Sequence, residues 1–88
     1  MRISLTLKTR WFDMIESGYK KEEYRDITPH WKKRIGQRMN EITEVYFTNY
    51  RKEMVFKVDK ITIGTPKRKW TERPDRVCYI LHLGERIQ

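Results

Sequence analysis

The sequence contains a single cysteine, Cys78, so no internal disulfide can form. Because this thiol lies inside an apolar run, we interpret it as a small buried side chain in a reducing compartment and not as a catalytic nucleophile. The sequence also lacks an apolar run long enough to cross a bilayer, and it has no basic-then-apolar leader. These absences predict a soluble, cytoplasmic protein with no membrane segment.

Histidine, serine and glycine are also scarce. His30 and His82 lie far apart, and neither pairs with Cys78 at a spacing typical of zinc ligands, so we expect no metal site and no cofactor. The two serines do not stand in a nucleophile-elbow sequence, which argues against a serine triad. Gly64 and Gly84 stand singly, without the lysine arrangement of a phosphate-binding loop.

Basic residues, by contrast, are abundant: 20 Lys and Arg against 12 Asp and Glu give a formal net charge of +8. This excess favours polyanionic partners, with nucleic acid as the first candidate. Small basic proteins also arise for solubility alone, so the charge by itself leaves both interpretations open. With 88 residues the chain is large enough for one core, and we expect a single domain over 1–88.

Hydrophobic periodicity predicts an α+β domain. Period-two patterns predict five or six short strands, over residues 2–7, 20–25, 42–47, 54–63 and 76–83, with a short final strand over 85–88. Two short amphipathic helices are expected after the first strand, one over 10–17 capped by Thr9 and one from Pro29 to Gly36 capped by Thr28. A phase shift at Asp59–Lys60 predicts a β-bulge, and the loop 64–74 is expected to be exposed. The combination favours a small mixed barrel.

The stretch from Gly18 to Arg25 is predicted to be a strand, yet it carries little that a strand normally buries. Alternation divides it into two faces, with Lys21, Glu23 and Arg25 against Glu22 and Tyr24. Lys20, just after the glycine turn, can lean toward Glu23 and Arg25. Two interpretations stay open: an edge strand whose charges prevent aggregation, or a strand whose paired charges line a wet cleft. In the second, Glu23 and Arg25 face a solvent-connected cleft.

Aromatic residues stand beside basic ones at several points, a mixture that suits single-stranded RNA or flipped bases. Trp11 and Trp31 occupy helical positions typical of a core. Trp70 lies in a cationic loop, where it is either a recognition platform or a loop anchor. The basic run at residues 32–34 is typical of a solvated helix face and could also touch phosphate.

Gly18, Lys20 and Arg25 form a Gly-x-Lys-x-x-x-x-Arg motif that follows an amphipathic helix. The opening Ile3-Ser4-Leu5 strand precedes the motif, and the strand 79–84 closes the chain. In this order and spacing the sequence resembles the activating-signal-cointegrator homology (ASCH) domains of the PUA-like superfamily, in particular small stand-alone members from phages and bacteria. The resemblance implies a PUA-like β-barrel, a cleft beside the motif strand, and a role in RNA binding or RNA-associated enzymology.

The resemblance also implies which residues line the cleft. Lys20 and Arg25 are carried over from the motif, and Glu23 lies between them on the cleft side. With their aromatic and basic neighbours, the candidate ligand-binding residues are Lys20, Glu23, Tyr24, Arg25, Lys67, Arg68, Trp70 and Tyr79. The expected ligand is RNA or a modified nucleoside or nucleotide. The alternatives are a nucleoside- or RNA-directed hydrolase, of amidohydrolase or ribonuclease type, and a protein-interaction module in transcription or RNA metabolism.

In an enzyme of this kind, Lys20 and Glu23 would be the catalytic pair. Some family members hydrolyse the acyl amide of N4-acetylcytidine with a threonine three residues after the motif lysine, but Glu23 stands at that position here. Glu23 offers no hydroxyl, and its negative charge keeps Lys20 protonated. We therefore predict no appreciable release of cytidine when N4-acetylcytidine is incubated with an excess of the protein. Hydrolysis that disappears in Lys20→Ala would contradict this expectation.

Overall fold

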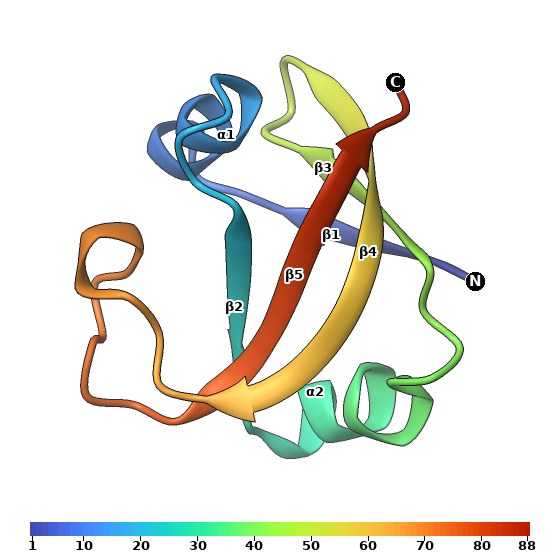
Figure 1. The fold of residues 1–88 in the computed structure, drawn as a ribbon, viewed down its shortest axis with the longest axis vertical. Helices are drawn as coiled ribbons and strands as arrows, with labels where there is room; N and C mark the ends of the chain where they lie inside the picture. The colour runs from blue at the N-terminus through green and yellow to red at the C-terminus, as the bar shows by residue number, and fades with distance from the viewer.

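The computed structural model describes residues 1–88 as an α+β domain in which a five-stranded mixed sheet curls into a half-barrel (Figure 1). The strands are β1 (Arg2–Thr6), β2 (Glu22–Asp26), β3 (Glu44–Thr48), β4 (Glu53–Gly64) and β5 (Cys78–Arg86). The helices are α1 (Thr9–Glu16) and α2 (Pro29–Arg34), with 3₁₀ turns η1 (Gly36–Arg38) and η2 (Arg68–Trp70). One helix follows β1 and the other follows β2. No helix is long and apolar enough to cross a membrane.

The two helix starts differ from each other. At α2 the prediction is confirmed, because the Thr28 hydroxyl accepts a hydrogen bond from the Trp31 backbone N–H at 3.3 Å and Pro29 takes the first position. At α1 the predicted cap is wrong: Lys8 is the N-cap, Thr9 is already helical, and no side chain caps the helix. Gly18, with φ of +85°, ends this first helix as expected.

A tight turn at residues 49–52 joins β3 to β4 in a hairpin. The Asn49 side chain accepts hydrogen bonds from the backbone N–H groups of Arg51 and Lys52, at 3.0 and 2.8 Å. Farther along, the pairing of β4 with β5 shifts register between Phe56 and Lys60, which confirms the predicted bulge. The irregularity bends β4 around the core, and the long curved strand is plain in Figure 1.

The two segments predicted at the end of the chain are one strand, β5. It lies inside the sheet, in the order β1-β3-β4-β5-β2, and it is apolar on both faces. The four residues from Cys78 to Leu81 are all buried. The helices α1 and α2 lie at opposite ends of the curled sheet, and 15 buried side chains form the core.

The charged strand β2 is an edge strand, and β1 is the other edge. No backbone ladder joins the two edges. Instead the Arg25 side chain donates to the Thr6 carbonyl of β1 at 2.9 Å, and the Arg34 side chain donates to the Ser4 carbonyl at 3.4 Å. Side chains therefore bridge the gap that a closed barrel would fill with strand pairing.

Gly36 packs against the buried ring of Tyr79, and a Cβ at this position would collide with the Tyr79 hydroxyl. We predict that Gly36→Ala lowers the free energy of unfolding by about 1–3 kcal/mol, because the core must shift to admit the methyl group. Gly84→Ala is the matched control, since its Cβ meets only the exposed Asp59 side chain, which can swing away. Urea unfolding measures both, and equal midpoints for the two variants would contradict this packing.

Candidate functional site

A buried ionic network lies where β2 meets α1. Lys20 and Glu23 are the only buried charged residues, with 3% and 5% of their surface exposed. The Lys20 Nζ lies 2.9 Å from Glu23 Oε1. The Arg25 Nε and Nη2 donate to Glu23 Oε2 at 3.2 and 2.9 Å. One carboxylate thus holds two cations, and the network keeps a net charge of +1.

The local backbone explains why Lys20 reaches this network. After Gly18 turns the chain, the Lys20 backbone N–H donates to the Met14 carbonyl of α1 at 2.9 Å. The ammonium group then lies 4.5 Å from the centre of the Trp11 ring. Its distance to the centre of the Tyr24 ring is 5.5 Å. Lys20 precedes β2, which begins at Glu22 and not at residue 20 as predicted. The expected lean of Lys20 toward Glu23 is confirmed.

The network lines a pocket of about 380 Å³. Its lining residues come from β2, from α1 and α2, and from the loop that carries η2. Figure 1 shows α1 and α2 at the two ends of β2 and this loop beside the strand. All three tryptophans of the chain line it. The lining residues are Lys8, Trp11, Lys20, Glu23, Tyr24, Arg25, Asp26, Thr28, Trp31, Pro66, Trp70, Thr71, Glu72, Arg73, Arg76 and Cys78. The prediction that Glu23 and Arg25 face a cleft is confirmed, and we call this space the tryptophan pocket.

The network leaves hydrogen-bond donors free. The Lys20 ammonium has three N–H groups and one hydrogen-bonded partner, Glu23. The Arg25 Nη1, with two N–H groups, has no partner in the protein. Both oxygens of Glu23 are already engaged. The charged side of the tryptophan pocket is therefore complementary to a ligand group that accepts hydrogen bonds or carries negative charge.

Ion pairs hold the loop wall of the pocket against β2. The Asp26 carboxylate of β2 binds two arginines of the loop, Arg73 at 2.6 Å and Arg76 at 3.2 Å. Lys8 lies 3.6 Å from Glu72 in the same wall. These pairs are exposed, so each stabilises the fold by roughly 1 kcal/mol or less, and they mainly position the loop.

The tryptophans differ from expectation. The loop around Trp70 was expected to be exposed, and Trp70 itself to be either a recognition platform or a loop anchor; it is only 4% exposed and contacts Tyr19 edge-on at 6.1 Å between ring centres, as a loop anchor would. Its buried ring anchors the loop, with the Lys67 and Lys69 ammonium groups 4.8 and 4.7 Å from its centre. Trp11 and Trp31, expected in the core, are only partly buried and line the pocket. The signal that could have identified them is the basic residue beside each, Arg10 before Trp11 and Lys32 after Trp31.

Tyr24 joins the pocket from the other face of β2. Its hydroxyl donates to Glu22 at 2.7 Å and accepts from the Lys67 backbone N–H at 3.2 Å. Burial, reinforced by the Glu22 carboxylate, raises the pKa of Tyr24 well above its usual range, so the phenol stays neutral. Tyr24 therefore supplies an uncharged ring beside the cationic network.

Of the candidate ligand-binding residues, five line the tryptophan pocket: Lys20, Glu23, Tyr24, Arg25 and Trp70. The other three lie outside its lining. Tyr79 is 4% exposed and belongs to the core. Lys67 and Arg68 are exposed on the loop, where they pair with Glu22 at 3.8 Å and Asp75 at 3.5 Å.

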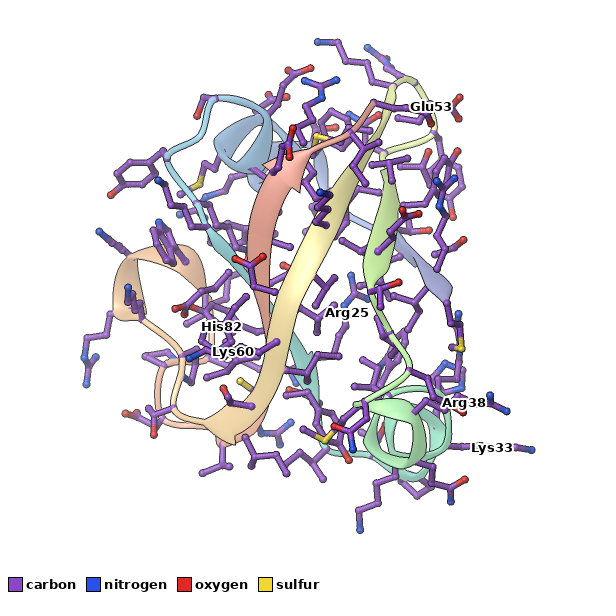
Figure 2. The ribbon with its side chains drawn as sticks, turned by 45° about the vertical axis from the view of Figure 1, so that its right-hand side comes forward. Arg25, Lys33, Arg38, Glu53, Lys60 and His82 are labelled. Carbon is purple, nitrogen blue, oxygen red and sulfur yellow. The ribbon has the colours of Figure 1, made fainter.

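His82 lies on the sheet face away from the network. Its Nε2 lies 2.8 Å from the Thr62 hydroxyl and its Nδ1 lies 3.7 Å from Glu22. Figure 2 shows His82 beside Lys60, its partner on β4. Neither His82 nor Thr62 lines the tryptophan pocket. No group of three or more His, Cys, Asp or Glu side chains is arranged to hold a metal ion.

Comparisons of the chain with protein-family models, with curated proteins and with solved structures found no match. The resemblance to ASCH domains therefore stays a prediction. What the tryptophan pocket can bind has to be inferred from the residues that line it.

Removing the charge of Glu23 tests the network. We predict that Glu23→Gln destabilises the fold by about 3–5 kcal/mol, because Lys20 and Arg25 then lose the carboxylate that compensates their burial. Glu44→Gln is the control: it breaks the exposed pair with Arg2 and should cost at most about 1 kcal/mol. Chemical denaturation compares the two, and a Glu23→Gln loss no larger than that of Glu44→Gln would show that the network is not buried in solution.

Cys78 gives a pH-dependent test of the same region. Burial raises the pKa of its thiol to about 11, and the charges of Asp26, Glu23 and Glu22 add to the effect. The folded chain therefore holds this proton to higher pH than the unfolded chain does. The resulting stability is fully present below pH 9 and is lost as pH rises toward 11.

Between pH 8 and 11 we expect the wild type to lose roughly 1–2 kcal/mol more of its unfolding free energy than Cys78→Ala does. Urea titrations of the two proteins at matched pH values measure the difference. Parallel pH profiles would mean that the Cys78 thiol titrates freely in the folded state.

Proposed function

We propose that the chain binds a nucleotide unit of RNA, or a modified nucleoside, in the tryptophan pocket of a PUA-like ASCH-type barrel. The observation that carries this proposal is the convergence of all three tryptophans on one pocket whose charged side has free Lys20 and Arg25 donors. Nucleotides need flat surfaces for the base and cations for the phosphate, and these are the two kinds of group that this pocket combines.

The size of the pocket supports a small planar ligand. Its volume of about 380 Å³ lies at the lower end of the range for small-molecule sites, about 300–1,000 Å³. A peptide helix or a duplex does not fit such a space, whereas one unstacked nucleotide does. The pocket therefore favours single units or single strands over double-stranded nucleic acid.

The free donors indicate which edge of a base would face the network. Lys20 and Arg25 can donate further hydrogen bonds, whereas both Glu23 oxygens already accept from these two residues. Carbonyl oxygens and ring nitrogens accept hydrogen bonds, so a base would present an acceptor edge such as guanine O6 and N7. A base edge that only donates would find no free acceptor among Lys20, Glu23 and Arg25.

A hydrolase of the amidohydrolase type is less well supported. Its lysine must accept a proton from a nucleophilic hydroxyl, but the Lys20 ammonium is bonded to Glu23. The pocket does contain Thr28 and Thr71. Neither forms a hydrogen bond with Lys20 or Glu23, and the Thr28 hydroxyl caps α2. Binding is therefore the better account of this geometry.

Tryptophan fluorescence tests the proposal directly, because every indole of the chain lies at the pocket. We expect quenching when guanosine monophosphate or a ten-nucleotide single-stranded RNA of mixed sequence is added at low salt. Arg25→Lys keeps the positive charge beside Glu23 but loses the planar fork, so affinity should fall about 10–100-fold. Arg51→Lys, in the exposed β3–β4 turn, should bind like the wild type.

Two outcomes would contradict the proposal. One is the absence of any fluorescence or calorimetric response to all four ribonucleoside monophosphates and to the RNA. The other is an Arg25→Lys variant that remains folded and binds as tightly as Arg51→Lys.

A further inference from the structure

A second hollow lies at the other end of α2, beside the start of β1. It has a volume of about 230 Å³ and is lined by Met1, Arg2, Ile3, Lys33, Arg34 and Arg38. Four of these residues are basic and none is acidic. Figure 2 shows Lys33 and Arg38 extending from the corner formed by α2 and η1, near the first residues of the chain. We call this space the basic hollow.

The basic hollow is connected to the tryptophan pocket by a row of three side chains. The guanidinium groups of Arg25 and Arg34 lie over the Trp31 ring, at 5.1 and 5.2 Å from its centre. Arg25 and Trp31 line the pocket, and Arg34 lines the hollow. The row therefore leads from one space to the other.

The same row follows the free edge of β1. Arg25 donates to the Thr6 carbonyl and Arg34 donates to the Ser4 carbonyl. Residues two apart in a strand direct their carbonyls to the same edge, so the two arginines stand side by side along it. Their cationic groups form a short positive track between the pocket and the hollow.

Charge in the hollow is only partly compensated within the protein. Arg2 pairs with Glu44 at 2.9 Å and Arg38 with Glu41 at 3.5 Å, both at the surface. Lys33 and Arg34 have no carboxylate within ion-pair distance. Arginine and lysine that lack a carboxylate partner are suited to phosphate, and Arg34 can offer a planar fork of donors to it.

We propose that the basic hollow binds the backbone phosphates of a single-stranded RNA whose neighbouring nucleotide occupies the tryptophan pocket. This inference rests on the proposed function of that pocket. The strand would leave the pocket over Arg25, Trp31 and Arg34, follow the free edge of β1, and place a phosphate beside Lys33 and Arg38. The ligand is then an oligonucleotide, and a free nucleoside fills only part of the site.

The test removes charge from the hollow and leaves the tryptophan pocket intact. The double variant Lys33→Gln, Arg38→Gln loses two charges at exposed positions, one unpaired and one paired with Glu41. The control double variant Lys57→Gln, Lys60→Gln also loses two exposed charges, here on β4. Lys57 is paired with Glu85 and Lys60 is unpaired, so the control matches the hollow variant. Both proteins have the same net charge, so a general loss of attraction affects them equally.

The probes are a fluorescein-labelled ten-nucleotide single-stranded RNA of mixed sequence and guanosine monophosphate, titrated at several salt concentrations. For the hollow variant we expect at least a tenfold loss of affinity for the RNA and no change for the monophosphate. The slope of log K against log salt should fall by about 1.4, because each single-strand phosphate contributes about 0.7. The control variant should lose much less affinity for the RNA, and its salt slope should fall by much less.

The remaining outcomes separate the failure of the phosphate site from the failure of the tryptophan pocket's proposed function. RNA that binds no more tightly than the monophosphate, or equal losses in the two double variants, would refute the phosphate site while leaving the pocket's function standing. A ten-residue oligoglutamate that competes as well as the RNA would assign the hollow to acidic peptides instead. No binding of either nucleotide probe would refute both the pocket's function and the phosphate site.

Discussion

The Glu23 carboxylate, held between Lys20 and Arg25, is the interaction on which the rest of the site depends. It lets a small domain bury an ammonium group and part of a guanidinium group without leaving either uncompensated. Glu23 accepts from both cations, which line the tryptophan pocket and keep N–H groups without a partner in the protein. Glu23 therefore compensates the two charges while leaving Lys20 and Arg25 with donors for a ligand.

The same network shapes the fold. A curled sheet with two free edges exposes backbone groups that invite aggregation. Here Arg25 reaches from the network on β2 to the Thr6 carbonyl of β1, and Arg34 repeats the contact at Ser4. Two arginines and the Trp31 ring thus occupy the gap between the edges. Because side chains fill this gap instead of a strand, it can present charge and aromatic surface to a ligand.

The sequence predicted much of this arrangement through local rules. Strand alternation put Glu23 and Arg25 on one face, the Thr28-Pro29 pair identified the start of α2, and the phase shift at Asp59–Lys60 located the bulge. These features depend on neighbours in the chain, which periodicity and capping describe. The merging of the last two segments into β5 was missed, because Gly84 suggested a break that the pairing with β4 overrides.

The positions of the tryptophans could not be predicted in the same way. Trp11 and Trp31 have helical spacings typical of core residues, and only the three-dimensional path of β2 turns them toward a pocket. For Trp70 the sequence left a recognition platform and a loop anchor open, and its buried position against Tyr19 identifies it as an anchor. Likewise, the basic hollow joins residues at the start of the chain with residues at least 30 positions later. Such contacts depend on topology, which the pattern of a single sequence left open.

We propose that the Lys20–Glu23–Arg25 network and the half-buried indoles of Trp11 and Trp31 form one ligand-binding surface. Nitrogen–proton NMR spectra, recorded while a single-stranded RNA is added, observe the indole N–H groups and the Arg25 Nε–H separately. We expect the Arg25 signal and the signals of Trp11 and Trp31 to shift together and to saturate at one RNA concentration, while the amide signal of Tyr50 in the distant turn does not move. Shifts confined to surface lysines, with the indole and Arg25 signals unmoved, would contradict it.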